Sequence, residues 1–178
     1  MIIRINGCFG VGKTTTAELL HQWIPDSHLY DPEEFGAFLW HCFPAPMKRN
    51  GDFQDLELWR SFTCSMLRHI SQNYGGHILV PMTIVNPAYF DEIIGALRRD
   101  GSIVRHFILT ASREVILSRL LGRGEEKNSW AEQQLDRCMK AFETCIDGER
   151  IDTTRQSAEA AARCILARIF CTPSAPLR

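Results

Sequence analysis

Hydrophobic residues occur along this chain in short apolar runs that alternate with longer stretches of helical period. The short runs predict buried strands at residues 2–6, 27–30, 77–82, 103–109 and 150–152. Apolar positions spaced three and four apart predict helices at residues 13–23, 54–74, 87–100, 112–121, 130–144 and 156–170, with a further helix beginning at residue 32. Short strands separated by helices favour a parallel sheet covered on both faces, a three-layer α/β fold.

Capping residues and helix-breaking residues mark where these elements begin and end. Asp31 and Asn86 each stand before a proline, the pattern of an N-cap followed by proline in the first helical turn. Residues 43–51 and 122–129 are rich in polar residues, proline or glycine and are predicted loops. The tail at residues 171–178 carries two prolines, and we expect it to be loose.

Composition narrows the class of protein. The chain has 178 residues, 45% of them hydrophobic, which suits one globular domain spanning residues 1–178. Lys and Arg number 20 against 21 Asp and Glu, which excludes binding of nucleic acid through bulk charge but leaves a local basic patch open. We expect no nucleic-acid partner. The seven cysteines are an odd number and have no C-x-x-C spacing, which argues against a disulfide framework. No set of His and Cys residues has the spacing of a zinc site. No signal peptide or membrane span is recognisable in the sequence. We therefore expect reduced thiols and a cytoplasmic location.

The loop after the first strand carries a complete phosphate-binding motif, G-x-x-x-x-G-K-[ST]. Its residues, which we predict to bind the nucleotide together with Thr15, are Gly7, Cys8, Phe9, Gly10, Val11, Gly12, Lys13 and Thr14. Glycines let the backbone aim successive N–H groups at a phosphate, and the following helix presents its N-terminus to the same anion. Lys13 then reaches the β- and γ-phosphates, and the Thr14 hydroxyl ligates Mg²⁺. The motif predicts binding of ATP with Mg²⁺.

Sequence features outside the phosphate-binding motif distinguish between the classes of P-loop protein. The chain has no Asn-Lys-x-Asp guanine-recognition motif, and the third predicted strand lacks the terminal acid of a hydrolytic site. Instead, Asp31 follows the second strand, eighteen residues after Lys13. Ligands gather at the carboxyl ends of parallel strands, so Asp31 is placed to accept a proton from a substrate hydroxyl or to hold a water on Mg²⁺. Capping the next helix is its alternative role, and both roles are compatible.

Arg119 and Arg123 end a predicted helix and lead into a short lid at about residues 122–130. Arginines on a lid stabilise the charge that develops during phosphoryl transfer, and a guanidinium also stacks on adenine. We therefore assign both arginines to catalysis and Arg119 to nucleotide binding as well. The alternative is a basic helix end favoured by the helix dipole. Arg137 is a further candidate in the next helix.

The acceptor side is expected beyond Asp31. Several large apolar residues there suit either a wall for an apolar ligand or ordinary core packing, namely Phe35, Phe38, Leu39, Trp40, Trp59 and Phe62. Arg60 stands among apolar neighbours and is either a substrate ligand or a partner in a salt bridge. Met82 and Thr83 lie at the end of the third predicted strand, where side chains are placed to contact substrate.

These residues resemble the small-molecule and nucleoside monophosphate kinases of the P-loop fold, whose lid begins with a similar arginine pair. The chain is most similar to the tunicamycin-resistance (TmrB-like) family, over about residues 1–144. The residues that carry this resemblance are Asn6 to Thr14, Tyr30-Asp31-Pro32-Glu33, Leu58-Trp59-Arg60, Val80-Pro81-Met82-Thr83-Ile84-Val85 and Lys127-Asn128-Ser129-Trp130-Ala131. Glu33, within the second motif, joins Asp31, Arg60, Met82 and Thr83 as an expected substrate-binding residue.

The resemblance implies a five-stranded parallel sheet in the order 2-3-1-4-5 with a short lid. It also implies an ATP-binding protein that confers resistance to tunicamycin, a nucleoside antibiotic carrying uracil, sugars and a fatty acyl chain. The leading hypothesis is phosphoryl transfer to a hydroxyl of such a ligand. The alternatives are an ATP-dependent protein that sequesters the drug without chemistry, and a housekeeping metabolite or nucleotide kinase. Oligomeric state is not predicted.

The last predicted helix presents one apolar face, formed by Ala158, Ala162, Ile165, Leu166 and Ile169. We expect that face to pack on the sheet. Binding to a membrane surface is the less favoured alternative, because the helix has only two arginines to attract lipid headgroups.

Overall fold

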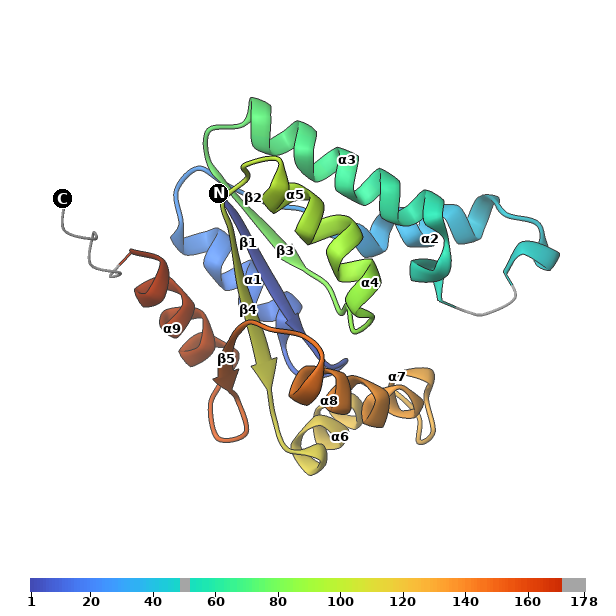
Figure 1. Cartoon of the computed structure of the whole chain (residues 1–178). Coiled ribbons are helices and arrows are strands. Elements are labelled where there is room, and N and C mark those ends of the chain that lie inside the picture. Colours follow the sequence, from blue (N-terminus) through green and yellow to red (C-terminus); the bar gives the residue numbers. More distant parts are fainter. Residues whose placement is uncertain (49–51, 171–178) are drawn as a thin grey trace.

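A five-stranded parallel sheet runs through the centre of the protein (Figure 1). The computed structural model describes residues 1–48 and 52–170, so the predicted loose tail lies outside the described residues. The strands are β1 (Ile2–Gly7), β2 (Ser27–Leu29), β3 (His77–Pro81), β4 (Val104–Thr110) and β5 (Glu149–Asp152). Every pairing is parallel and the order is β2-β3-β1-β4-β5, which confirms the predicted sheet.

Helices cover both faces of the sheet (Figure 1). Helices α1 (Lys13–Trp23) and α9 (Ala158–Phe170) lie against each other. Helix α3 (Glu57–Asn73) packs against a second continuous helix made of α4 (Pro87–Phe90), the π-helical turn η3 (Asp91–Gly95) and α5 (Ala96–Arg99). Between β2 and α3 come α2 (Pro32–Cys42) and the 3₁₀ turns η1 (Ala45–Met47) and η2 (Phe53–Asp55). Helices α6 (Arg113–Gly122), α7 (Trp130–Gln133) and α8 (Leu135–Thr144) gather at the carboxyl end of β4.

The core consists of two apolar clusters separated by the sheet. All six residues of β1 are buried, and successive side chains alternate between the clusters. Ile3 and Ile5 belong to the cluster that contains α1 and α9, whereas Ile2 belongs to the cluster that contains Trp59 and Leu67 of α3. A central strand buried on both faces reads as a nearly continuous apolar run, which explains why the sequence pattern identified it.

Of the large apolar residues predicted to form either a ligand-binding wall or the core, some are buried in the core and others are exposed. Trp59 is fully buried, and its indole Nε1 donates to the carbonyl of Pro32 over 3.0 Å. The rings of Phe35 and Phe62 stack at 3.7 Å, and Phe38 lies 6.1 Å from Phe35 with 58% of its surface exposed. Trp59 is therefore core, while Phe38 offers an apolar surface to solvent.

Two predicted helices are less regular than their sequence pattern indicates. The helix predicted at residues 130–144 is divided at Gln134 into α7 and α8. The helix predicted at residues 87–100 contains the π turn η3. A Cβ at Gly95 would lie 2.0 Å from Asp91 Oδ1, so glycine there makes room for the Asp91 side chain, which accepts from Arg99 at 2.8 Å.

Helix α9 packs on the sheet as predicted. Ala161, Ala162 and Ile165 are fully buried in the same cluster as β1 and β4. Within the described part of the chain, no helix is long and apolar enough to cross a membrane.

Two polar side chains are buried next to each other inside the sheet. Arg4 of β1 is paired in register with His106 of β4, and both are at least 96% buried. The Arg4 guanidinium donates to the carbonyls of Val80 and Met82 at 3.4 and 2.9 Å. His106 donates through Nδ1 to the carbonyl of Asp147 over 2.7 Å. Burial, reinforced by the positive charge of Arg4, lowers the pKa of His106 to about 3.

The buried His106 predicts acid sensitivity. Its pKa in the folded state is about 3, below the 6.5 of an unburied histidine, so the stability it contributes is present above pH 6.5 and is lost as the pH falls toward 3. We expect the free-energy gap between the wild type and His106→Gln to shrink by about 1–3 kcal/mol between pH 7 and pH 4. Urea unfolding at several pH values measures it, with exposed His41→Gln as control. Parallel pH profiles of the wild type and His106→Gln would contradict this assignment.

Candidate nucleotide and acceptor site

The loop between β1 and α1 has the backbone conformation of a phosphate-binding loop. Gly7, Gly10 and Gly12 have φ values of +142°, +78° and +107°, which side-chain-bearing residues rarely adopt. A Cβ at Gly7 would also lie 2.5 Å from the carbonyl oxygen of Leu109. Such turns let consecutive N–H groups face one anion, so the loop fits a nucleotide phosphate.

Side chains from two segments hold the start of this loop in place. Asn6 Oδ1 accepts from the N–H groups of Gly7 and Ile84, each at 3.0 Å, and Asn6 Nδ2 donates to the Ile84 carbonyl. The Thr83 hydroxyl donates to the Gly7 carbonyl over 2.9 Å. The segment after β3 is thus fastened to the phosphate-binding loop through polar groups that the sequence pattern does not reveal.

Met82 and Thr83, predicted to contact substrate, lie at the expected end of β3, but each is only 1% exposed. The carbonyl of Met82 accepts from Arg4, and the carbonyl of Thr83 accepts from Gln54 Nε2 over 2.9 Å. Both residues therefore have structural partners in this state, and their contact with a substrate stays a prediction.

Lys13, the first residue of α1, is 8% exposed and rests against its own loop. Its Nζ donates to the Cys8 carbonyl over 3.0 Å and lies 5.4 Å from the centre of the Phe9 ring. Burial lowers the pKa of Lys13 to about 8, against the opposing effect of Glu33. Thr14 and Thr15 follow at the N-terminus of α1 with exposed side chains, so the Thr14 hydroxyl is accessible to a metal ion.

Asp31 lies at the start of α2 and interacts electrostatically with Lys13. Asp31 Oδ1 accepts from the Glu33 N–H over 2.9 Å, which confirms the predicted helix cap. Burial raises the pKa of Asp31, while the charge of Lys13 lowers it. Burial also raises the pKa of Glu33, again opposed by Lys13, although Glu33 stays exposed.

Arg119 of α6 is held by four acceptors. Its guanidinium donates to the carbonyls of Val11, Thr153 and Gln156 at 3.2, 2.7 and 3.3 Å, and to Thr153 Oγ1 at 3.0 Å. Arg119 therefore ties the loop after β5 to the phosphate-binding loop. The hydroxyl of Thr153 is a part of this site that no sequence signal indicates.

A cleft of about 390 Å³ opens beside these groups. Its lining includes Gly12, Thr15, Arg119, Arg123 and Ser157. The volume lies within the range of small-molecule sites, and the cleft adjoins the phosphate-binding loop. The structure thus brings Arg119 and Arg123 together with the loop, at a position suited to the nucleoside part of a nucleotide.

Arg60, a candidate substrate ligand, already has partners in the protein. Arg60 Nε donates to Glu92 at 2.5 Å, Nη1 donates to the Gln54 carbonyl at 2.7 Å, and the guanidinium lies 4.2 Å from the Tyr89 ring. The salt-bridge alternative for Arg60 is therefore present, and its contact with substrate stays a prediction.

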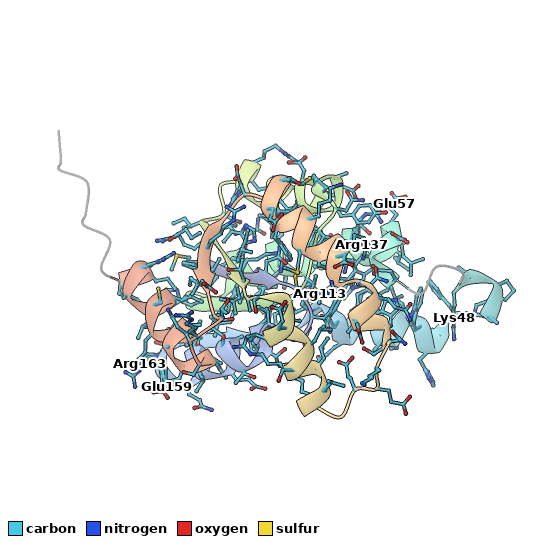
Figure 2. All side chains as sticks on the ribbon, turned by 90° about the horizontal axis from the view of Figure 1, so that it is seen from below. Lys48, Glu57, Arg113, Arg137, Glu159 and Arg163 are labelled. Carbon is cyan, nitrogen blue, oxygen red and sulfur yellow. The ribbon has the colours of Figure 1, made fainter. Side chains whose placement is uncertain are left out.

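Arg137 of α8 lies 3.5 Å from Asp52, the cap of η2, whose side chain is 14% exposed. Figure 2 shows Arg137 far from the Arg163–Glu159 pair of α9. This contact joins the helices after the predicted lid to the segment between α2 and α3. No sequence signal indicates that Asp52 takes part in this contact.

Comparison with known proteins identifies the family. A family model described as an AAA domain matches residues 2–145. The structure of the Deinococcus radiodurans tunicamycin resistance protein is 31% identical in sequence, with 98% of each chain covered and a TM-score of 0.80. The chain belongs to the tunicamycin-resistance family of P-loop kinase-like proteins. No curated protein matches the sequence.

More distant structures share the fold of this tunicamycin-resistance family member. A sugar kinase from Janibacter sp. HTCC2649 is 19% identical over 97% of this chain and 95% of its own, with a TM-score of 0.68. The Acinetobacter baumannii shikimate kinase in complex with shikimate is also 19% identical, over 98% and 95%, with a TM-score of 0.63. The predicted P-loop kinase fold is confirmed, and this fold is a nucleotide-binding one.

The four bonds of Arg119 predict a specific effect on nucleotide binding in this family member. Lysine cannot span acceptors on both loops, so Arg119→Lys should raise the Kd for ATP about tenfold, the equivalent of one or two lost charge-assisted hydrogen bonds. Isothermal titration calorimetry measures the change. Arg163→Lys, in an exposed pair on α9, is the control and should leave the Kd unchanged. Equal affinities of Arg119→Lys and the wild type would show that Arg119 does not organise the nucleotide site.

Proposed function

We propose that this protein binds ATP with Mg²⁺ and transfers the γ-phosphoryl group to a hydroxyl of tunicamycin or a similar nucleoside antibiotic, and that it thereby confers resistance. The observation that carries the proposal is the placement of Asp31. Its carboxylate lies at the carboxyl edge of the sheet, interacts electrostatically with Lys13, and stays accessible. The 31% identity to a tunicamycin resistance protein supports the choice of acceptor.

The nucleotide half of the reaction uses the phosphate-binding loop and the adjoining cleft. The loop N–H groups and Lys13 hold the phosphates, and Arg119 and Arg123 line the cleft beside them. The Thr14 hydroxyl would hold Mg²⁺, which when bound neutralises phosphate charge. Arg123 follows the last residue of α6 as its C-cap. We expect closure of the lid to bring it toward the phosphates.

The acceptor half uses Asp31 as the base that takes the proton of the attacking hydroxyl. Burial raises the pKa of this carboxylate, which strengthens it as a proton acceptor. One carboxylate oxygen, Oδ1, accepts from the Glu33 N–H, and this bond fixes the orientation of the carboxyl group. Phe35, Phe38 and Phe62 form a partly exposed aromatic surface on the same side, which suits an acceptor with an apolar portion.

One observation favours a second function, ATP-dependent binding of the drug without chemistry. Asp31 already has a structural role as the cap of α2, and that role alone accounts for the residue. In that case ATP closes the lid over the bound drug, and Asp31 contributes only to the fold. A housekeeping metabolite kinase would use the same groups on another hydroxyl.

Mass spectrometry of the drug separates these functions. Incubation with ATP, Mg²⁺ and tunicamycin should add the mass of one phosphoryl group to the drug. Asp31→Asn keeps a capping oxygen but loses the base, so its rate should fall at least about a hundredfold. Glu34→Gln, exposed on the same helical turn, should retain the wild-type rate. ATP-dependent drug binding with no change in mass would establish sequestration, and indifference to tunicamycin would favour a metabolite kinase.

The buried Lys13 predicts how ATP affinity depends on pH. The pKa of Lys13 is about 8, and only the charged ammonium attracts phosphate. We expect the affinity to be constant below pH 8 and to fall about tenfold per pH unit above it. Calorimetry between pH 7 and 9.5 tests this, and Lys13→Ala should abolish binding. Lys13→Arg is charged throughout this range, so a sloping profile in that variant would assign the pH dependence to another group.

A further inference from the structure

The 3₁₀ turn η2 contacts both α2 and α3 and has no place in the proposed function. The ring of Phe53 lies against Gly36 of α2, where a Cβ would stand 2.6 Å from the ring. Asp55 accepts from the Tyr89 hydroxyl of α4 over 3.0 Å. A single 3₁₀ turn has few backbone hydrogen bonds of its own, so these side-chain contacts decide where it lies.

Gln54, the middle residue of η2, is only 7% exposed and has three polar groups bonded to other residues. Its N–H donates to Asp52 Oδ1 over 3.0 Å, and its carbonyl accepts from Arg60 Nη1 of α3 over 2.7 Å. Its side-chain Nε2 donates to the Thr83 carbonyl over 2.9 Å, across a separation of 29 residues in the chain. A buried carboxamide without a partner would be costly, so this last bond fixes the side chain in one orientation.

The bond to Thr83 is the first of two that lead from η2 to the phosphate-binding loop. Thr83 is 1% exposed, and its hydroxyl donates to the Gly7 carbonyl over 2.9 Å. Gly7 is the last residue of β1, where the loop begins. Burial shields both bonds from competing water, which strengthens them. Asn6 fastens the segment after β3 to the same loop, and Gln54 extends this fastening to η2 and to Arg60.

We propose that Gln54 is a positioning residue for the acceptor, which holds η2 and Arg60 at a fixed place relative to the phosphate-binding loop. The proposal rests on the proposed function, in which the acceptor binds on the side of α2 and α3. Gln54 acts through Arg60 and Thr83 and takes no part in bond breaking. Misplacement of a reactant by about 1 Å can lower a rate about a hundredfold, so a fixed link between the two halves of the site bears directly on transfer.

Gln54→Met tests this link, because methionine keeps the length of the side chain and removes the donor. The Thr83 carbonyl then loses its side-chain partner, while the contacts of Phe53 and Asp55 remain. Gln72→Met makes the same substitution at an exposed position of α3 and is the matched control. Thr83→Val has nearly the same shape as the wild type and breaks the second bond, so it tests the link from its other end if Gln54→Met folds poorly.

The first experiment needs no ligand. The carbonyl carbons of Thr83 and Gly7 are followed by NMR in ¹³C- and ¹⁵N-labelled protein, since a carbonyl signal moves upfield when its oxygen loses a hydrogen bond. Both signals should move upfield in Gln54→Met, the Gly7 signal should move upfield in Thr83→Val, and neither should move in Gln72→Met. Signals of β5 should keep their positions in every variant, which loss of structure would not allow. A Gly7 signal at its wild-type position in Gln54→Met would overturn the proposal.

The second experiment measures phosphorylation of tunicamycin and, separately, the affinity for ATP. In Gln54→Met, kcat/KM for tunicamycin should fall at least about tenfold. The Kd for ATP should stay within about twofold of the wild type, because Asn6 still holds the loop. A variant that had lost its structure would lose affinity for both ligands. Combining Gln54→Met with Thr83→Val should cause no further loss than the more impaired single variant, because the two bonds lie in series.

The outcomes separate failure of this proposal from failure of the proposed function. An active wild type with an equally active Gln54→Met, an equal loss of ATP affinity in that variant, or additive effects of the two substitutions would overturn the positioning role alone. If the wild type binds tunicamycin without phosphorylating it, the Kd for tunicamycin takes the place of kcat/KM and should rise about tenfold in Gln54→Met. A wild type that neither binds nor alters tunicamycin would refute the proposed function, and the acceptor role of Gln54 with it.

Discussion

The close approach of Gly7 to β4 is the constraint on which the carboxyl edge of the sheet depends. At this residue β1 ends and the phosphate-binding loop begins, and a side chain would meet the Leu109 carbonyl at 2.5 Å. The same residue donates to Asn6 Oδ1 and accepts from the Thr83 hydroxyl. One residue without a side chain thus joins β1, β4 and the segment after β3. The positions of Lys13 and Thr14 follow from it, because α1 begins where this loop ends.

Electrostatics at that edge are organised around the buried cation Lys13. Lys13 has little contact with water, so carboxylates that face it, above all Glu33 and Asp31, interact with it more strongly than they would at an open surface. Other cationic side chains nearby have their own acceptors, with Arg119 on backbone carbonyls and Arg137 on Asp52. This edge of the sheet therefore has a defined distribution of charge, which would reduce the reorganisation needed for the proposed phosphoryl transfer.

The backbone of this site could be predicted from the sequence, and much of its side-chain arrangement could not. The strand positions, the phosphate-binding loop and the cap at Asp31 follow from local signals, namely apolar runs, glycine spacing and the Asp-Pro pair. The partners of Arg119 come from residues 11, 153 and 156, and nothing local indicates such a meeting. The sequence places Thr83 at the correct edge, yet its hydroxyl donates to the Gly7 carbonyl, a partner 76 residues away that no local pattern indicates.

The buried Arg4 and His106 are a further case in which apolar pattern misleads. Both lie in strands that read as core, and carbonyls of segments distant in the chain accept their hydrogen bonds. A buried cation in a central strand costs stability unless such acceptors are available. Arg4 also interacts electrostatically with Glu33 of α2, which links the interior to the site.

The strand order has one more consequence, for the behaviour of the protein at high concentration. The two strands with open edges, β2 and β5, are the shortest of the sheet, with three and four residues. Each offers few free backbone groups to which another chain could add a strand. Glu149 of β5 is also engaged by Arg105, which places charge along that border. Short, charged edge strands disfavour edge-to-edge aggregation of sheets. The longer, apolar central strands are therefore protected from pairing with another chain.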